Sequence, residues 1–325
     1  MKRRKFLGLL AGAAIARSVR AQQQAMPLIG FLSSRSAGDS SRVLDGFHRG
    51  LAEAGLTEGR NVAVVYRWAD GIYDRLAPLA AELAGSPISI LFAVGGEPAA
   101  RAAVAAGAKI PVVTVFASDP VSSGLIKSLS HPENNVTGVS ILSASIEPKR
   151  IGLMHDLLPQ STAFAVLLNP ATPTYAEQFA AAQSAAYSIG VEMKSLKAGS
   201  DQDIEKAFAT VDQQRIAAVL VSADPFLLVK RADIVALAEK SRVPVMYPYR
   251  DFAEVGGLMS YGVDLADSYR QMATYAGQIL KGARPEELPV AVPTKFEFVI
   301  NLKAARSLGI MIPASLLAIA DEVIE

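Results

Sequence analysis

One order of strands and helices occurs twice along the chain, and this repeat constrains the fold more than any other feature. Apolar strands are predicted first at residues 28–32, 62–66, 88–94 and 112–116, and again at 164–168, 191–196, 217–221 and 243–246. Helices with apolar residues three or four positions apart lie between them, one of which is predicted from Leu227 to Lys240. Continuous apolar strands that alternate with helices are typical of parallel sheets covered on both faces. The sequence therefore predicts an α/β protein with two doubly wound, Rossmann-like lobes.

The C-terminal part of the chain predicts how the two lobes are joined. Further strands are expected at 258–261 and 296–300, and helices at 267–281 and 302–308. If these elements are shared between the lobes, the chain crosses three times, near residues 139–143, 261–264 and 290–294. The N-terminal lobe would then comprise 26–141 plus 262–290, and the C-terminal lobe 142–261 plus 291–325. A three-crossing hinge beside a cleft suits closure around a ligand.

The N-terminus has the pattern of an export signal. Basic residues from Lys2 to Lys5 precede a short apolar run from Leu9 to Ala16, as in a secretory signal peptide. The sequence Arg3-Arg4-x-Phe6-Leu7 is similar to a twin-arginine signal, and a general secretory signal is the alternative. We expect residues 1–21 to be the signal peptide, with cleavage after Ala21 and a mature protein in the periplasm.

Composition excludes several classes of function. The chain has no cysteine, which removes disulfides, thiolate metal sites and cysteine nucleophiles together, and its three histidines lack metal-ligand spacing. The net charge is +1, without a basic cluster beyond the N-terminus, so no nucleic-acid partner is expected. No later segment is apolar over the roughly 18 residues of a membrane span, so the mature chain should not insert into a membrane. Neither a G-x-G-x-x-G turn nor a phosphate-binding loop is present, and no cofactor is predicted. A monomer is the expected state.

Several fragments together resemble a known family. They include Ile29-Gly30-Phe31-Leu32, Phe47-x-x-Gly50-Leu51-x-Glu53-x-Gly55, Asn135-Val136-Thr137-Gly138-Val139 and Ser307-Leu308-Gly309-Ile310-x-Ile312-Pro313. Spread over nearly the whole mature chain, they resemble the ABC-importer substrate-binding proteins of the tryptophan/tyrosine type, which have the periplasmic-binding-protein type I fold. The resemblance implies a two-lobed receptor that delivers a small organic ligand to an ABC permease and its ATPase. Members with assigned ligands bind aromatic amino acids, so an amino acid is the first expectation.

Ligand-contacting residues are predicted from the fold class. Ligands of open α/β sheets bind beyond the carboxyl ends of the strands, which selects particular loops. The predicted ligand-binding residues are Ser33, Ser34, Gly96, Glu97, Asp119, Asn169, Thr174, Tyr175, Asp224, Tyr247, Tyr261 and Asp264. Hydroxyl and backbone N–H groups at helix starts suit a carboxylate, and a buried carboxylate suits an ammonium group. Tyrosine rings can stack on a planar side chain.

Simpler roles exist for several of these residues. Asp119 and Asp224 each precede a proline, and Asp in that position often caps or turns the chain. Glu97 could serve only the first turn of a helix. Tyr247 and Tyr249 alternate along an extended segment, so only one of them should face the cleft.

Three other functions are alternatives to that of a binding protein. Asp119 and Asp224 could form an acid/base pair across the cleft, which would make the chain an enzyme. A periplasmic sensor that presents its ligand to a receptor kinase would have the same fold and pocket. A transcriptional regulator is disfavoured, because the predicted signal peptide occupies the place of a helix-turn-helix. We therefore predict a binding protein without catalytic residues or bound metal.

Overall fold

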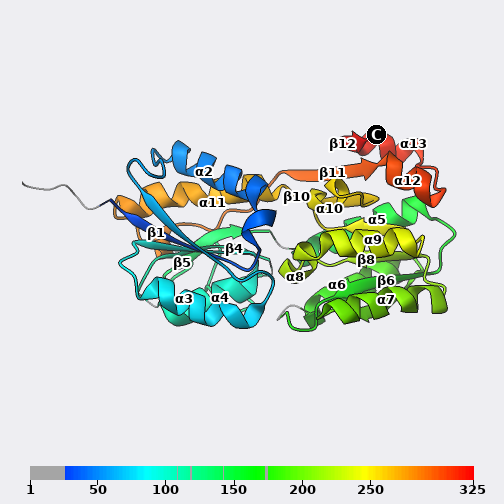
Figure 1. The fold of residues 1–325 in the computed structure, drawn as a ribbon, viewed down its shortest axis with the longest axis horizontal. Helices are drawn as coiled ribbons and strands as arrows, with labels where there is room; N and C mark the ends of the chain where they lie inside the picture. Colours follow the sequence, from blue (N-terminus) through cyan, green and yellow to red (C-terminus); the bar gives the residue numbers. More distant parts are fainter. Residues whose placement is uncertain (1–25, 108, 118, 142, 173–174) are drawn as a thin grey trace, which may run out of the picture.

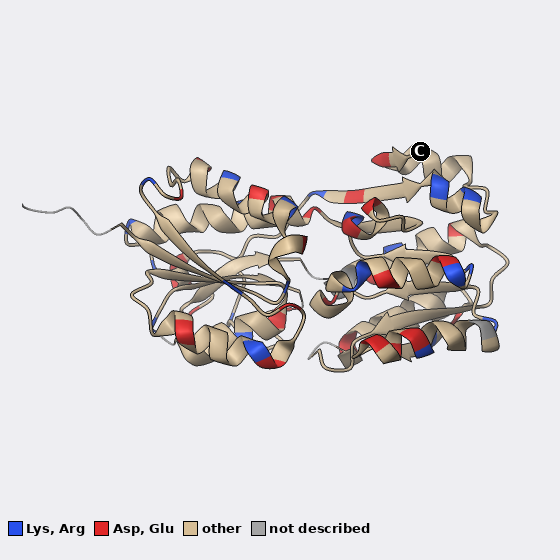
Figure 2. Ribbon diagram, viewed as in Figure 1, with Lys and Arg blue, Asp and Glu red and all other residues tan. Residues whose placement is uncertain are grey.

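The computed structural model describes residues 26–107, 109–117, 119–141, 143–172 and 175–325, which form two α/β lobes arranged end to end (Figure 1). The expected signal peptide and Thr174 lie outside the described residues. Within the described part of the chain, no helix has the length and apolarity required to cross a membrane. Figure 2 shows that charged residues lie mainly on helices and loops, whereas the central strands of both sheets are nearly free of them.

The N-terminal lobe contains a sheet of five parallel strands in the order β2-β1-β3-β4-β5. These strands are β1 (Leu28–Ser33), β2 (Ala63–Trp68), β3 (Ile90–Val94), β4 (Val112–Phe116) and β5 (Val136–Ser140). Helices cover both faces of the sheet (Figure 1). They are α3 (Leu76–Ala84) and α4 (Glu97–Ala106) on one face, and α2 (Ser41–Glu53) and α11 (Leu265–Leu280) on the other. Short 3-10 turns are η1 (Ala37–Asp39), η2 (Tyr73–Arg75) and η3 (Pro285–Glu287).

The C-terminal lobe contains a seven-stranded sheet in the order β12-β11-β10-β9-β8-β6-β7. Its strands are β6 (Ala163–Leu168), β7 (Glu192–Lys197), β8 (Ala218–Val221), β9 (Val245–Tyr247), β10 (Met259–Val263), β11 (Phe296–Asn301) and β12 (Glu322–Ile324). The helices are α5 (Ser143–Leu157), α6 (Tyr175–Ser188), α7 (Asp201–Gln213), α8 (Pro225–Val229), α9 (Arg231–Lys240), α10 (Arg250–Glu254), α12 (Leu302–Leu308) and α13 (Ala314–Ile319). Strands β7, β6, β8, β9 and β10 are parallel and repeat the strand order of the first lobe.

The chain crosses between the lobes three times, which confirms the predicted fold class. It leaves the first sheet after β5 to form α5, and it leaves the second sheet after β10 to form α11. It then returns from Ala291, which bridges to Val139 of β5, to β11, which pairs with β10 in antiparallel orientation. The residue limits of the two lobes remain a prediction.

Two glycines bring α11 close to α2. A Cβ atom on Gly46 would lie 2.1 Å from the carbonyl oxygen of Ala266, and one on Gly50 would lie 2.0 Å from that of Arg270. Both approaches are shorter than any side chain tolerates, so the two helix backbones meet directly at these positions. The apolar face of α2, with Phe47 fully buried, packs into the core of the lobe. Helix α11 is thereby fixed to the N-terminal lobe although it follows a strand of the other lobe.

Two parts of the structure differ from the expectation. The single helix predicted from Leu227 to Lys240 is two helices, because Lys230 leaves the helical conformation between α8 and α9. Strand β5 and helix α5 were not predicted. Strand β5 (VTGVS) contains only two apolar residues and Gly138, so it does not form an apolar run, and α5 contains Pro148, which disfavours a helix in the sequence pattern.

Candidate ligand-binding site

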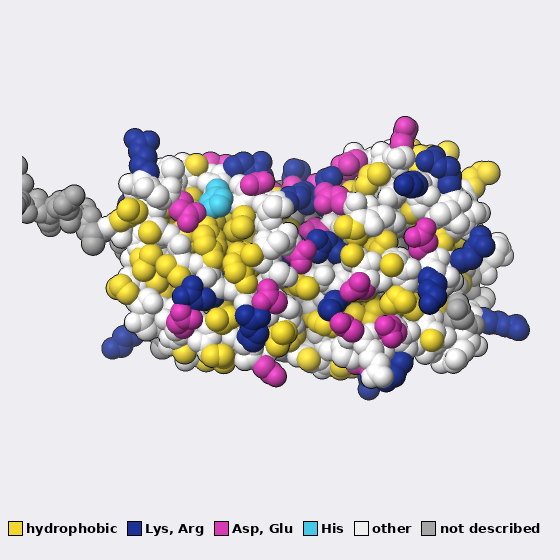
Figure 3. All heavy atoms as spheres, in the orientation of Figure 1, with side chains coloured by type: hydrophobic (Ala, Val, Ile, Leu, Met, Phe, Trp, Pro, Cys, Tyr) yellow, Lys and Arg dark blue, Asp and Glu magenta, His cyan; other side chains and the backbone are white. Residues whose placement is uncertain are grey.

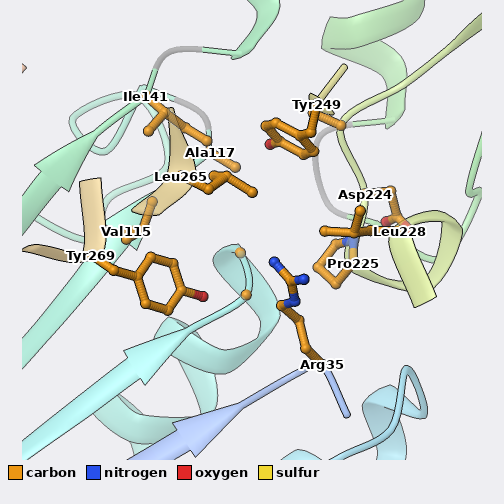
Figure 4. Close-up of a pocket in the computed structure, with 13 residues that line it drawn as sticks. Arg35, Val115, Ala117, Ile141, Asp224, Pro225, Leu228, Tyr249, Leu265 and Tyr269 are labelled. Atoms are coloured by element: carbon orange, nitrogen blue, oxygen red, sulfur yellow. The ribbon is translucent and has the colours of Figure 1, made fainter. Parts of the chain in front are cut away.

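A cavity lies between the two lobes. It is lined by Arg35, Gly95, Gly96, Val115, Ala117, Ile141, Ala223, Asp224, Pro225, Leu228, Tyr249, Leu265 and Tyr269. Figure 4 shows that these residues come from both lobes and surround one space. The cavity lies beyond the carboxyl ends of β1, β3, β4 and β8, as the rule for open α/β sheets predicts.

Arg35 places a positive charge in this cavity. It follows β1, and its side chain is only 3% exposed. Nη2 donates to Oδ1 of Asp251 across the lobes at 3.2 Å, whereas Nε and Nη1 have no hydrogen-bond partner among the described residues. The guanidinium group points into the space between the two lobes in Figure 4. Unpaired donors on a buried cation suit an anionic group such as a carboxylate.

The turn before α4 forms another wall of the cavity. Gly95 and Gly96 have φ angles of +83° and +99°, which side-chain-bearing residues rarely adopt. A Cβ atom on Gly95 would lie 3.0 Å from the backbone nitrogen of Ser34, and one on Gly96 would lie 3.1 Å from Cγ of Pro225 in the other lobe. The glycines therefore let the β1 loop and the opposite lobe approach the start of α4. Its N-terminal end adds a partial positive charge to the same wall as Arg35.

Asp224 joins the two lobes at the edge of the cavity. Its carboxylate caps α8 by accepting from the backbone N–H of Leu227 at 3.1 Å, and it accepts from Nδ2 of Asn169 at 3.1 Å. The phenol of Tyr73, in the N-terminal lobe, donates to its second oxygen at 2.7 Å. Burial raises the pKa of Asp224, while the three donors act in the opposite direction. Asp224 is therefore a hydrogen-bonded link between the lobes as well as a lining residue.

The remaining walls are apolar or aromatic. Val115, Ile141 and Leu265 form one side, and the rings of Tyr249 and Tyr269 flank the space (Figure 4). Burial raises the pKa of Tyr269 to about 12, so its phenol is neutral at physiological pH. A cavity with one cationic group and apolar walls suits an organic ligand that carries a carboxylate at one end and an apolar body at the other.

Comparison with known proteins decides the family. A sequence profile described as ABC transporter substrate binding protein matches residues 34–324, which is most of the chain. The chain belongs to this family.

Two solved structures and a sequence relative are similar to this chain. A conserved domain protein from Vibrio cholerae is 26% identical, with a TM-score of 0.86 over 92% of this chain and all of that one. The ABC domain from Streptococcus pneumoniae in complex with L-Trp is also 26% identical, with a TM-score of 0.82 over 91% of this chain and all of that one. A tyrosine-binding protein from Clostridioides difficile is 22% identical over 81% of this chain and 75% of its own length.

Some of the predicted ligand-binding residues lie at the cavity of this substrate-binding protein. Gly96 and Asp224 line it. Asn169 lies directly behind Asp224 and donates to it. Ser34 is fully buried in the β1 loop, and its hydroxyl has no hydrogen-bond partner among the described residues. Ser33 accepts from the backbone N–H of Arg35 at 3.1 Å and so shapes the loop that holds the guanidinium group.

Two other predicted residues are not among those that line the cavity. Asp119 accepts from the hydroxyl of Ser122 at 2.6 Å and from the backbone N–H of Val121 at 3.0 Å, and these donors lower its pKa. Glu97 is buried and accepts from Nε of Arg101 at 2.8 Å. The acid/base pair of Asp119 with Asp224 is therefore not assembled around the cavity.

The tyrosines and Asp264 have structural contacts. Tyr247 stacks on Phe252 with ring centroids 4.7 Å apart, and Tyr249 is the member of this alternating pair that lines the cavity. The hydroxyl of Tyr175 contacts that of Ser195 at 3.1 Å, and the ring of Tyr261 stacks on Phe296. Asp264 caps α11 and binds Arg42 and Lys295, each at 3.1 Å; although burial acts to raise its pKa, these partners lower it.

The most informative residues were not selected from the sequence. Arg35 follows the predicted residues Ser33 and Ser34 directly in the sequence. Its positive charge, in the loop after the first strand, could have identified it as a ligand-binding residue. Tyr269 and Leu265 carried no such signal, because only the crossing before α11 brings them to the cavity. Tyr73 reaches Asp224 from a short turn whose position the helix periodicity did not reveal.

The same substitution at Asp224 and at Asp119 tests which of the two carboxylates belongs to the binding site. Asp224→Ala is expected to weaken ligand binding at least tenfold, because it leaves Tyr73 and Asn169 without an acceptor and removes the α8 cap, which contributes about 1 kcal/mol. Asp119→Ala removes a carboxylate that only closes its own turn, so affinity should stay within about twofold. Isothermal titration of both variants checks the difference. Equal losses of affinity would place Asp119 in the site.

Proposed function

We propose that this protein is the receptor of an ABC importer for an α-amino acid with an apolar or aromatic side chain, which it binds between its lobes. The observation that carries this proposal is Arg35, a buried guanidinium group with two unpaired donors in a cavity whose other walls are mostly apolar or aromatic. Family membership supports the transport role. The L-Trp complex and the tyrosine-binding relative support the ligand class.

The ligand would lie with its carboxylate on Arg35 and the start of α4. Its ammonium group would lie near the acidic groups of the C-terminal lobe, Asp224 and Asp251; one oxygen of Asp251 has no partner among the described residues. The side chain would then occupy the part of the cavity lined by Ile141, Leu265 and Tyr249. Because such a ligand contacts both lobes, it binds the closed arrangement more tightly than an open one and shifts the population toward closure.

Delivery requires the protein to be outside the cytoplasm and to meet a permease. The predicted signal at residues 1–21 supports export, and the mature chain from Gln22 would act as a monomer in the periplasm. The permease and its ATPase would recognise the closed arrangement of the lobes, whichever amino acid they enclose. Charges of both signs are interspersed over both lobes on the face shown in Figure 3, which supports the expectation that nucleic acid is not a partner.

Thermal unfolding of the refolded mature chain tests the ligand class. At a concentration about 100-fold above Kd, a ligand stabilises the folded state by about 2.7 kcal/mol, which raises Tm by several degrees. We expect such shifts with L-tryptophan, L-tyrosine or L-phenylalanine. Tryptamine, which lacks the carboxylate, should give none, and 3-indolepropionate, which lacks the ammonium group, should give a smaller shift. A tryptamine shift equal to that of L-tryptophan would contradict the role of Arg35.

A further inference from the structure

Contacts that join the lobes also lie outside the cavity lining. Tyr73, in the turn after β2, is partly buried, and its phenol reaches Asp224 in the other lobe at 2.7 Å. Tyr73 does not itself line the cavity. Because Asp224 is held by Asn169 and by the backbone of α8, it is a rigid acceptor. Closing the lobes therefore brings a neutral donor onto a fixed, buried carboxylate.

A second bond crosses the lobes nearby. Nη2 of Arg231, at the start of α9, donates to Oδ1 of Asp39 in η1 at 2.7 Å. Nη1 of Arg231 donates to the carbonyl of Leu228, which fixes the guanidinium group to the end of α8. The hydroxyl of Ser36 donates to the other oxygen of Asp39, so both partners are held by their own lobes. Neither Asp39 nor Arg231 lines the cavity.

The backbone at Gly71, close to Tyr73 in the sequence, also packs against the opposite lobe. Gly71, with φ of +77°, lies against α8: a Cβ atom there would come within 3.7 Å of Phe226 and Val229. Gly71 thus contacts α8, Tyr73 bonds its N-terminal cap Asp224, and Arg231 ties its last turn to η1. All of these contacts need the lobes to be together, and all of them converge on one five-residue helix.

We propose that Tyr73 and Asp39 are closure residues, which hold the lobes together through Asp224 and Arg231 and set how long a bound ligand is retained. The proposal rests on ligand binding between the lobes. Because Tyr73 and Asp39 do not line the cavity, they add the same stabilisation to the closed form for any ligand. They therefore tune affinity without changing the preference among ligands. Apparent affinity rises in proportion to the closed fraction, and the gain appears as slower ligand release.

The test combines binding kinetics with a direct measurement of closure. Since the chain has no cysteine, one cysteine can be introduced on an exposed helix position of each lobe, Ala77→Cys in α3 and Glu205→Cys in α7, for dye labelling and single-molecule energy transfer. Tyr73→Phe removes only the phenolic oxygen. Tyr66→Phe is the matched control, because its phenol bonds Glu58 within the N-terminal lobe. The control for Arg231→Gln is Arg67→Gln, which breaks the Arg67–Glu82 ion pair within the N-terminal lobe.

Tyr73→Phe is expected to raise the release rate of L-tryptophan about tenfold, with little change in the association rate and the same ranking of ligands. Arg231→Gln should raise it about twofold to fivefold, because this ion pair is partly exposed. Both should shorten the closed dwell times, and the two controls should not. Unchanged release rates and dwell times in Tyr73→Phe would overturn the proposal.

The same measurements separate this proposal from the proposed function. If no amino acid changes the energy transfer of the parent chain, the ligand assignment fails. The closure proposal is then judged on the ligand-free chain, where Tyr73→Phe must make closed excursions shorter than in Tyr66→Phe. Equal excursions in the two variants would overturn it independently of any ligand.

Discussion

Replacing Arg35 with methionine is expected to weaken binding of an aromatic amino acid by at least 100-fold. Methionine keeps much of the apolar bulk of the side chain but removes the donors at Nε and Nη1, which would leave the ligand carboxylate buried without a partner. Removing one member of a buried charge pair costs about 2–5 kcal/mol, and a 100-fold loss corresponds to about 2.7 kcal/mol. Isothermal titration with L-tryptophan measures the change.

A conservative variant and a stability measurement complete this test. Arg35→Lys keeps the charge but not the planar fork, so it should retain part of the affinity lost in Arg35→Met. Both variants also lose the bond to Asp251, and the Tm of the ligand-free chain reports that loss separately. Arg49→Met, at an exposed position of α2, is the control for removing an arginine from the same lobe. Affinity within threefold of the parent in Arg35→Met would show that the carboxylate is bound elsewhere.

Replacing Gly50 with alanine is expected to destabilise the protein by about 2–3 kcal/mol. The new methyl group would meet the carbonyl of Arg270 at 2.0 Å, so α2 and α11 would have to separate along their contact. Gly46→Ala acts on the same contact through Ala266, and the double variant should lose less than the sum of the two, because one separation relieves both clashes. Thermal and urea unfolding measure the loss.

Gly152→Ala in α5 is the matched control for Gly50→Ala. It is also a glycine inside a helix, but nothing lies within 4 Å of the added methyl group, so it should stabilise by about 0.5–1 kcal/mol. Because α11 carries Leu265 and Tyr269 into the cavity, Gly50→Ala should also reduce ligand affinity. If the Gly50→Ala variant were as stable as the parent protein, the close approach of α2 and α11 would not be required for stability.

The sequence predicted the sheets well because their strands have strong local signals. Buried runs such as Ile90–Val94 and Val112–Phe116 are bounded by glycine or proline, and the helices between them have one apolar face. Strand β5 and helix α5 lacked these signals, since β5 (VTGVS) has only two apolar residues, and α5 contains Pro148 and has no clear apolar face. A local sequence pattern therefore predicts a strand or helix only when one of its faces is apolar or when glycine or proline marks its ends.

The site was less predictable for a different reason. The rule for strand ends found Gly96 and Asp224, because both follow a strand directly in the sequence. It also selected Asp119, whose carboxylate is used by its own turn, and Tyr247, whose ring packs on Phe252. Tyr269 and Tyr73 reach the cleft only through the crossing of the chain and the closure of the lobes. Such positions depend on tertiary structure that no local pattern encodes.

Helix α11 packs on the N-terminal lobe but comes late in the chain, and this order has a consequence for biosynthesis. The N-terminal sheet is complete when Ser140 leaves the ribosome, yet the helix that packs on α2 is made only with residues 265–280. Until then the face of the sheet and the apolar stripe of α2, including Phe47, lack their cover. The first lobe therefore cannot finish folding during most of translation. Most of the polypeptide must be synthesised before either half is stable, which leaves the nascent chain accessible to chaperones.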